Sequence, residues 1–433
     1  MMTHLLPFLL AFTSASSAED PIPQSIGAVE PGRILADVET LTGFHTRHTA
    51  SGNDSEDRGI GAARRWLVEQ FEAISRETGG RLEVREERFT RSIRGLGDVE
   101  MVNVYGFLPG TQGDPLGRTY VVSGHYDSRA RQGMDAESFA PGANDDASGT
   151  AVVLELARVL SGGEYDANLV FLTVPGEEQG LFGADHFAEQ AEARGLAIDG
   201  MITNDIVGGG EGGNGITDLR TVRCFSGAEG LHSTSRELAR SIRTSAARYV
   251  PDAEVRLIFR LDRFGRGGDH IPFHERGVPA VRLSEANENY ARQHQDVRVE
   301  DGVQYGDLAE FVSAEYMGRV ARVNGAALAE LAMAPAPPTG LRMRAAVSYD
   351  TQLSWSPVAG AVGYEVVWRD TTAPYWEQTL ELGAEPSVMR VRGEEREVMR
   401  ATVEGVTADG AFFGVRSVSA SGHRSRVVFP DRP

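Results

Sequence analysis

The chain has 433 residues, of which 41% are hydrophobic, and its formal net charge is -19 at pH 7. This length and composition suffice for at least one large buried core and indicate two domains. Nucleic acid is not an expected partner, because phosphate binding requires a basic surface. The single cysteine, Cys224, excludes an internal disulfide framework.

The first 18 residues have the features of a secretory signal peptide. An apolar run from Leu5 to Phe12 is followed by small residues that end at Ala18, so we expect cleavage before Glu19. The run is too short to span a bilayer, and no later stretch reaches that length. We therefore expect a chain without a membrane span that is secreted or periplasmic.

Residues 31–331 alternate between helical and strand patterns. The alternation indicates βαβ units, so we expect an α/β fold with a mixed, mostly parallel sheet flanked by helices. Apolar residues at helical spacing predict helices over residues 31–41, 55–74, 147–160, 181–193, 229–249 and 303–331. Short β-branched or alternating runs predict strands over residues 82–89, 101–108, 119–123, 168–174, 200–207, 221–225, 255–261 and 278–283.

A Pro/Ala-rich stretch at residues 333–338 separates this part from the rest of the chain. Such a stretch cannot continue a helix and is typical of a semi-rigid linker. Beyond it, Tyr364, Val366 and Trp368 recur at a spacing of two, which indicates short antiparallel strands. We therefore divide the chain into a signal peptide (1–18), an α/β domain (19–334) and a C-terminal all-β sandwich (335–433).

Acidic residues and histidines follow several of the predicted strands. In α/β sheets, ligands bind beyond the carboxyl ends of the strands, so we expect these side chains to meet at one rim. Together with the turn before the helix 147–160, the loops contain His125, Asp127, Asp145, Asp146, Glu177, Glu178, Asp205, His294 and Asp296.

The rim loops contain enough ligands for two divalent metal ions. Two imidazoles and three carboxylates give each ion a histidine and a terminal carboxylate, and the third carboxylate can bridge ions ~3.5–4 Å apart. This donor set suits Zn²⁺ best, and Co²⁺ or Mn²⁺ could replace it. A structural site of the cysteine type is excluded, because no thiolate lies among these loops.

Two short pairs suggest a division of roles within the rim. Glu177 and Glu178 are adjacent and point in different directions, so one can ligate metal while the other acts as general base. Asp127 can accept the N–H of His125 that faces away from the metal, and His294 and Asp296 repeat this spacing.

Structural interpretations of the same motifs stay open. A Glu-Glu pair can be a solvated loop, a lone histidine can be a satisfied core residue, and Asp146 can cap the helix 147–160. At residues 267–270 two roles are open, since His270 can line a substrate pocket and Asp269 can cap a helix.

Taken together, the loops resemble those of the co-catalytic zinc exopeptidases of metallopeptidase family 28. The resemblance covers about residues 30–331, and its motifs occur in the same order as in the family. They are Gly-His125-Tyr-Asp127-Ser, Pro-Gly-Ala-Asn-Asp145-Asp146-Ala-Ser-Gly, Gly-Glu177-Glu178-Gln-Gly-Leu-Phe-Gly, Asn-Asp205, Gly-Gly-Asp269-His270 and His294-Gln-Asp296.

The resemblance implies a zinc exopeptidase fold and a role for each rim residue. By position, the implied zinc ligands are His125 and Asp205 on one ion, Glu178 and His294 on the other, and Asp145 bridging both. The resemblance also implies that Glu177 is the general base, that Asp127 supports His125, and that the Asp145–Asp146 peptide is cis.

The chain departs from the family pattern at residues 263–267. Some relatives carry there a tyrosine that stabilises the oxyanion, whereas this chain has Arg-Phe-Gly-Arg-Gly. Arg266 is a candidate substitute, and a plain surface or salt-bridging arginine is the alternative. The C-terminal part resembles a fibronectin type III module through the motifs around Trp355, Tyr364 and Arg416.

These observations lead to an expected activity and its alternatives. The resemblance implies an aminopeptidase that acts on peptide substrates with two Zn²⁺ ions per chain. A carboxypeptidase, a glutaminyl-cyclase-like enzyme with one zinc and a non-catalytic binding protein are the alternatives. For the C-terminal part we expect contact with a surface, a polysaccharide or its own catalytic domain, or a role as a spacer.

Overall fold

The computed structural model describes residues 20–227, 233–391 and 394–430, so the predicted signal peptide lies outside the described residues. The α/β domain is built on an 8-stranded sheet with the strand order β1-β2-β4-β3-β5-β8-β6-β7. Its strands are β1 (Glu83–Ile93), β2 (Gly97–Leu108), β3 (Thr119–His125), β4 (Asn168–Val174), β5 (Ile198–Asn204), β6 (Thr221–Ser226), β7 (Glu254–Ile258) and β8 (Ala280–Glu285).

The centre of the sheet is parallel and its flanks are mixed. Strands β4, β3, β5 and β8 lie side by side and run in the same direction. Strands β2 and β6 pair antiparallel with this centre, and β1 and β7 form the two edges. Every residue of β3, β4 and β8 is buried, as expected for strands covered on both faces. The predicted mixed, mostly parallel sheet is confirmed.

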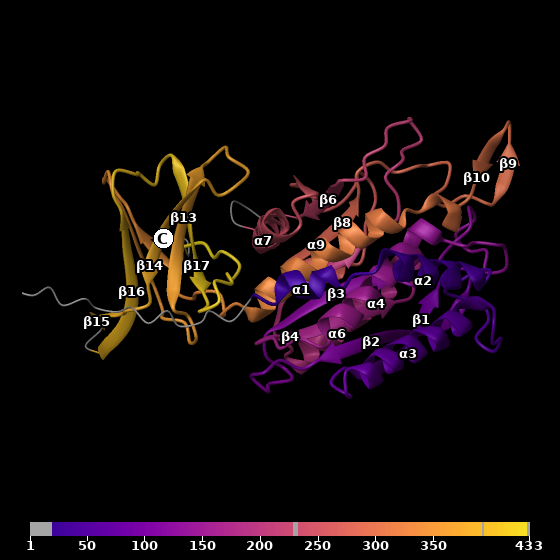
Figure 1. Ribbon diagram of the computed structural model, residues 1–433, viewed down its shortest axis with the longest axis horizontal. Helices are drawn as coiled ribbons and strands as arrows, with labels where there is room; N and C mark the ends of the chain where they lie inside the picture. The colour runs from indigo at the N-terminus through magenta and orange to yellow at the C-terminus, as the bar shows by residue number, and fades with distance from the viewer. Residues whose placement is uncertain (1–19, 228–232, 392–393, 431–433) are drawn as a thin grey trace, which may run out of the picture.

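Helices cover both faces of the sheet (Figure 1). Apolar residues of α1 to α4, α7 and α9 form the larger core cluster, and those of α6 and α8 form a smaller cluster. No described helix is long and apolar enough to cross a membrane. The helices are α1 (Ile22–Gly27), α2 (Pro31–Gly43), α3 (Gly59–Glu77), α4 (Ser148–Leu160), α5 (Glu177–Gly180), α6 (Phe182–Arg194), α7 (Thr234–Tyr249), α8 (His270–Glu275) and α9 (Ala314–Met333).

The predicted helix over residues 303–331 starts too early. Strands β9 (Arg298–Glu300) and β10 (Val303–Tyr305) form a hairpin in this region. Its turn residues Asp301 and Gly302 both have positive φ, 50° and 78°, which is the backbone that an Asp-Gly hairpin turn favours. Helix α9 begins only after Ser313, whose hydroxyl accepts the N–H of Tyr316.

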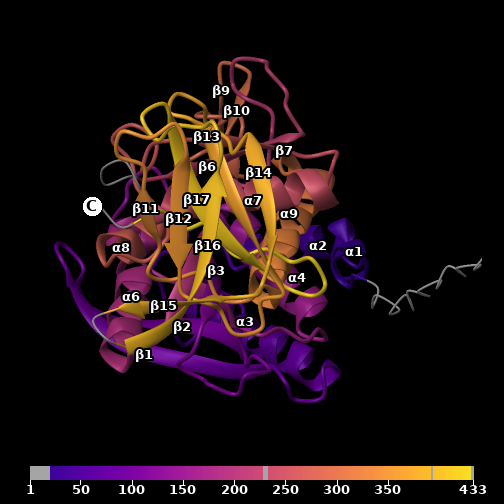
Figure 2. The same ribbon diagram turned by 90° about the vertical axis from the view of Figure 1, so that its left-hand side faces the viewer.

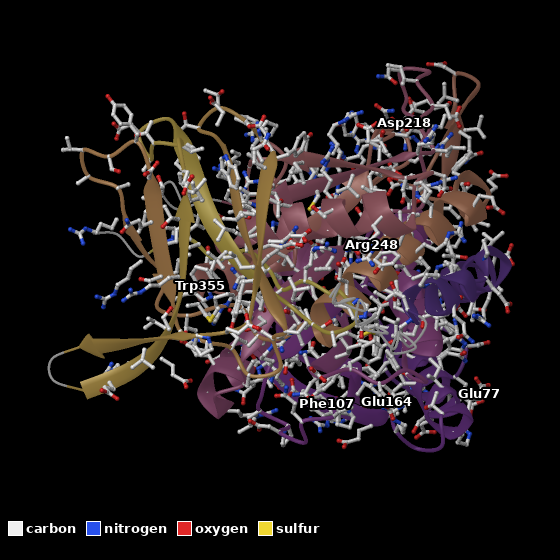
Figure 3. All side chains as sticks on the ribbon, turned by 60° about the vertical axis from the view of Figure 1, so that its left-hand side comes forward. Glu77, Phe107, Glu164, Asp218, Arg248 and Trp355 are labelled. Atoms are coloured by element: carbon white, nitrogen blue, oxygen red, sulfur yellow. The ribbon has the colours of Figure 1, made fainter. Side chains whose placement is uncertain are left out.

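The C-terminal part consists of two antiparallel sheets, with strand orders β11-β12-β16-β15 and β14-β13-β17. A separate apolar cluster fills it, and Trp355 lies within this cluster, 1% exposed (Figure 3). The predicted all-β character is confirmed. The strands are β11 (Arg342–Arg344), β12 (Thr351–Trp355), β13 (Gly363–Asp370), β14 (Gln378–Gly383), β15 (Ser387–Val391), β16 (Glu394–Val403) and β17 (Ala411–Val418).

The C-terminal part contacts helix α7 of the α/β domain. The indole N–H of Trp376 donates to Glu237 at 2.8 Å, and Nε of Arg240 donates to the carbonyl of Pro374 at 2.7 Å. The guanidinium of Arg243 lies 3.6 Å above the ring of Tyr375. The loop between β13 and β14 is therefore held on α7 by hydrogen bonds and by a cation–π contact.

Candidate metal centre

Five of the predicted rim residues meet at the carboxyl ends of the central strands. They form two groups of possible metal ligands that share one carboxylate. His125 ends β3, Asp205 follows β5, and Glu178 lies on α5 directly after β4. His294 comes from the loop after β8, and Asp145 from the turn before α4. The parallel strands thus bring together residues that are far apart in the sequence, because ligand sites in open α/β sheets form beyond the carboxyl ends of the strands.

The two oxygens of Asp145 face different histidines. Its Oδ1 is 3.1 Å from Nε2 of His125, which is also 4.0 Å from Oδ1 of Asp205. Its Oδ2 is 2.9 Å from Nε2 of His294, which is 3.1 Å from Oε1 of Glu178. This arrangement has the form of a bridging carboxylate between two ligand pairs.

The donor atoms suit a bound cation of the size of zinc. Bonds of 2.0–2.2 Å at a tetrahedral angle place two ligand atoms about 3.3 Å apart, close to most distances in these groups. Oε1 of Glu178 and Nε2 of His294 are buried, and apart from their close approaches to each other and to Asp145 neither has a hydrogen-bond partner within the described part of the chain. Their lone pairs are therefore open to a metal ion, and imidazole with carboxylate is a donor set that zinc accepts.

Several carboxylates of the centre are buried without enough positive charge nearby to balance their own. It raises the pKa of Asp205 to about 7 and that of Glu177 well above the usual range. Burial also disfavours the charge of Asp145, but His294 and His125 hold its pKa well below the usual range. A cation among these groups would favour their ionised forms.

Asp127 supports the centre from behind. Nδ1 of His125, on the side of the ring that faces away from Asp145, lies 3.2 Å from the main-chain carbonyl oxygen of Asp127 and 3.4 Å from its Oδ1. The same carboxylate accepts the backbone N–H groups of Glu177 at 3.3 Å and Glu178 at 3.2 Å. Asp127 thus lies beside His125, with its main-chain carbonyl nearer to the ring than its carboxylate, and its carboxylate fixes the start of α5.

Asp146 is turned away from the metal-ligand groups. The Asp145–Asp146 peptide is cis. The carboxylate of Asp146 accepts the backbone N–H of His125 and that of Gly149 in the first turn of α4, both at 3.0 Å. A Cβ at Gly149 would lie 2.2 Å from the carbonyl oxygen of Asn204, so only glycine fits there. Asp146 therefore accepts a hydrogen bond at the start of α4, as the capping interpretation requires. It also contacts the strand that ends in His125.

Arg282 is a neighbour of the centre that the sequence patterns did not reveal. It lies on β8 with no exposed side-chain surface, and its guanidinium is 2.7 Å from Oδ1 of Asp205. It also donates to the carbonyl of Gly267 at 2.7 Å and lies 3.3 Å from Asp262. The signal that could have found it is a charged residue within an otherwise apolar buried strand.

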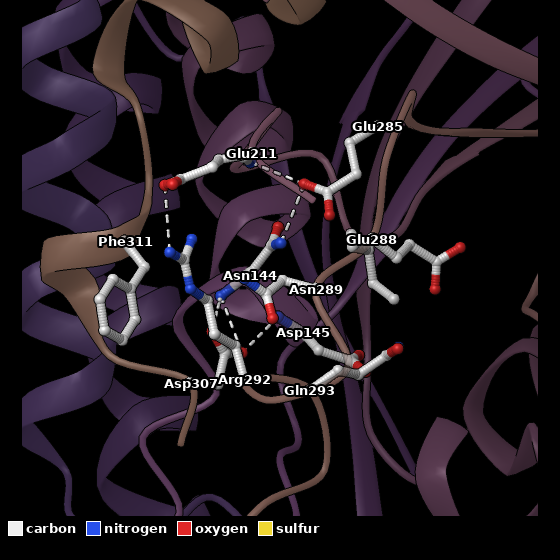
Figure 4. Close-up of a pocket in the computed structure, with 12 residues that line it drawn as sticks. Asn144, Asp145, Glu211, Glu285, Glu288, Asn289, Arg292, Gln293, Asp307 and Phe311 are labelled. Carbon is white, nitrogen blue, oxygen red and sulfur yellow. Dashed lines mark hydrogen bonds and ion pairs between the residues drawn. The ribbon is translucent and has the colours of Figure 1, made fainter. Parts of the chain in front are cut away.

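Asp307 and Gln293 hold Asp145 in place, and both were also missed. Asp307 accepts the backbone N–H groups of Asn144 at 2.9 Å and Asp145 at 2.8 Å. Nε2 of Gln293 donates to Oδ2 of Asp145 at 3.1 Å. Figure 4 shows Asp307 and Gln293 on either side of Asp145 in a small pocket. Asp307 lies in the segment predicted as helix, which concealed its role.

A cavity of about 440 Å³ opens at the metal-ligand groups. Arg266, the candidate oxyanion residue, lines it, but its guanidinium is also bound to Glu288 at 2.7 Å and to Gln293 at 3.1 Å. In this structure Arg266 is therefore a salt-bridging arginine. The lining residues are Asp145, Glu177, Glu178, Gln179, Gly180, Leu181, Asp205, Arg263, Arg266, Gly267 and His294.

Three predicted contacts take another form in the structure. His270 does not line this cavity, since its Nε2 lies 2.7 Å from the carbonyl oxygen of Leu261. Asp269 makes no capping hydrogen bond to α8, and its buried carboxylate has no partner among the described residues. Asp296 accepts the backbone N–H of Arg131, so the pairing of His125 with Asp127 is not repeated at His294.

Comparisons with known proteins identify the family of the chain. Residues 103–313 match Peptidase family M28. A probable zinc metalloprotease of Pyricularia oryzae is 41% identical over 96% of this chain and 86% of its own length. The LapA aminopeptidase of Legionella pneumophila matches 72% of this chain and 74% of its own at a TM-score of 0.55 and 19% identity. The glutaminyl cyclase of Fimbriiglobus ruber matches 70% and 95% at a TM-score of 0.51 and 20% identity. The chain belongs to peptidase family M28.

Proposed function

We propose that the chain is a di-zinc exopeptidase that removes residues from the N-terminus of peptides. The observation that carries the proposal is the pair of ligand groups that share Asp145 at the floor of a cavity of about 440 Å³. The names of the relatives in Pyricularia oryzae and Legionella pneumophila support zinc and the aminopeptidase activity, respectively. Export is part of the proposal, because residues 1–18 have the features of a signal peptide.

The metal-binding roles follow the two groups. His125 and Asp205 would hold one zinc, Glu178 and His294 the other, and Asp145 both. Co²⁺ or Mn²⁺ could replace zinc at such a donor set. When bound, the metal ions polarise the scissile carbonyl and make a nearby water more acidic.

Glu177 is the general base in this proposal. It lines the cavity but belongs to neither ligand group, so its carboxylate is free for proton transfer. Its backbone N–H is held by Asp127, which fixes the residue relative to His125. Glu177 takes a proton from the attacking water and returns it to the leaving amine.

The cavity suits the end of a peptide chain. Its volume lies within the range of pockets that enclose small ligands. Asp205 and Glu178 line it and can accept hydrogen bonds from the free α-ammonium group of a substrate. An N-blocked peptide has no such group and would lose this interaction.

The variant Glu177→Gln tests the role of the general base. It should lower the turnover of aminoacyl anilides by roughly 10²- to 10⁴-fold, while metal analysis still finds two zinc ions per chain. Glu72→Gln, at an exposed position on α3, is the matched control and should keep full turnover. Full turnover in the Glu177 variant would show that another group is the base.

A carboxypeptidase is the second candidate, because Arg263 and Arg266 line the cavity. A guanidinium can bind the terminal carboxylate of a peptide in two parallel hydrogen bonds. Assays with free aminoacyl substrates and with N-blocked peptides, on one metal-analysed sample, separate the two activities. Cleavage of the blocked peptides alone would rule out the aminopeptidase.

A further inference from the structure

In the C-terminal part, the outer face of the sheet β11-β12-β16-β15 carries an ordered set of arginines. In the register of β11, β12 and β16, Arg342 lies opposite Ser354, which lies opposite Arg400. The next row on the same face contains Arg344, Gln352 and Thr402. Neighbouring strands lie about 4.8 Å apart, so Arg342 and Arg400 are separated by roughly 10 Å. We call these six residues the arginine face.

The alternation of the strands fixes the direction of these side chains. Leu353 and Ala401, between the two rows, are buried in the core of the C-terminal part at 2% and 7% exposure. Side chains one position away point to the opposite side, which is solvent. Together with Met343, Leu353 and Ala401, the six residues line a hollow of about 630 Å³.

The three arginines have no internal partner. Within the described residues, no acidic side chain lies within ion-pair distance of Arg342, Arg344 or Arg400, and none of the three side chains makes a hydrogen bond. Elsewhere in the same part of the molecule, Arg416 and Arg424 both pair with Glu365, at 2.5 and 2.8 Å. The arginine face thus leaves three guanidinium groups available in a chain of net charge -19.

The arginine face is turned away from the α/β domain. Strand β16 lies at the end of the molecule opposite that domain (Figure 1), and a view from this end shows β12 and β16 in front (Figure 2). The loop between β13 and β14, in the other sheet, makes the contact with α7. A ligand on the arginine face would therefore leave the catalytic cavity accessible.

We infer that the arginine face binds a linear anionic polysaccharide with carboxylate or sulfate groups. Guanidinium groups bind such anions through paired hydrogen bonds. Between the arginines, Gln352, Ser354 and Thr402 offer uncharged donors and acceptors that suit sugar hydroxyls. Because the chain is otherwise acidic, a polyanion is attracted to this face and repelled elsewhere.

The composition of the face argues against other polyanions. Its six side chains are all polar or charged, and Met343 is the one exposed apolar side chain among the described residues that line the hollow, whereas binding to a membrane surface draws on several exposed apolar side chains. Single-stranded nucleic acid is bound largely by stacking on aromatic rings, and this face has none. The polysaccharide is thus the polyanion that its side chains fit.

Retention on immobilised heparin, and binding to polygalacturonate in affinity electrophoresis, test the inference on the full chain. The triple variant Arg342→Gln, Arg344→Gln, Arg400→Gln should weaken binding at least about tenfold and elute at lower salt. Arg58→Gln, Arg76→Gln, Arg94→Gln removes the same charge from exposed positions of the α/β domain and should bind as the unaltered chain does. The triple Lys variant of the arginine face should bind with intermediate strength, because charge is kept and paired hydrogen bonding is lost.

Several results would overturn the inference. These are equal weakening in both Gln variants, no binding by the unaltered chain, and binding to vesicles with phosphatidylserine in place of the polysaccharides. Neutral dextran serves as the uncharged control and should not bind. Thermal unfolding and hydrolysis of a small aminoacyl substrate, measured on the same samples, should be unchanged in all variants. Polysaccharide binding can thus fail without any change in peptidase activity.

Discussion

The two halves of the candidate metal centre are built in different ways. His125 and Asp205 lie at the ends of neighbouring strands, with side chains 0% and 3% exposed. Glu178 and His294 come from a short helix and a long loop, and the side chain of His294 is 30% exposed. Buried Arg282 contacts Asp205 at 2.7 Å, whereas the nearest guanidinium to Glu178, that of Arg129, is 4.0 Å away.

This difference suggests how the two halves should behave. Ligands on sheet strands are positioned by the backbone hydrogen bonds of the core, while those on loops depend on fewer contacts. The half with His125 is therefore preformed, and the guanidinium of Arg282 lies beside it. The half with His294 is closer to solvent and should exchange its metal ion faster. Variants at the shared residue and in each half test whether the two halves differ in this way.

The largest effect is expected at the shared residue, in the variant Asp145→Ala. Both halves lose a ligand, so metal content should fall below two ions per chain. The value of kcat/KM should fall by more than the roughly 10- to 100-fold typical of residues that only support ligands. Metal analysis and kinetics on the same sample check this. Two ions per chain and kcat/KM within tenfold of the unaltered enzyme would contradict the bridging role.

A smaller effect, confined to the strand-built half, is expected for Arg282→Met. The change leaves Asp205 and Asp262 buried without this cation, so the free energy of unfolding should fall by about 3–5 kcal/mol. Urea denaturation of the metal-free protein measures it. A loss below about 1 kcal/mol would mean that Arg282 contributes little to this half.

The smallest effect is expected in the loop-built half, for Gln293→Leu. It removes the donor to Oδ2 of Asp145, so metal affinity should fall by about tenfold, as for other groups that orient a ligand. Competition with a chelating dye measures the affinity. Arg129→Gln is the control, because a partly exposed pair at 4.0 Å contributes little. Equal losses in both variants would contradict a specific role for Gln293.

The sequence was sufficient to predict the centre of the sheet and the rim. The strand predicted over residues 168–174 coincides with β4, and parallel strands necessarily bring their carboxyl ends together. It was not sufficient for Arg282, whose partner Asp205 is 77 residues away. The Asp-Gly turn at residues 301–302 is a local signal, but apolar residues at helical spacing further along masked it.

The contacts of Pro374, Tyr375 and Trp376 with α7 hold the C-terminal part against the α/β domain. A polymer held at the far end would therefore set the direction in which the cavity opens, as well as keeping the enzyme nearby. Peptides attached to the same polymer would meet the cavity at a raised effective concentration only where their chain ends can reach it. The orientation of the bound enzyme would then select among substrates by position, in addition to the selection that the cavity makes by chemistry.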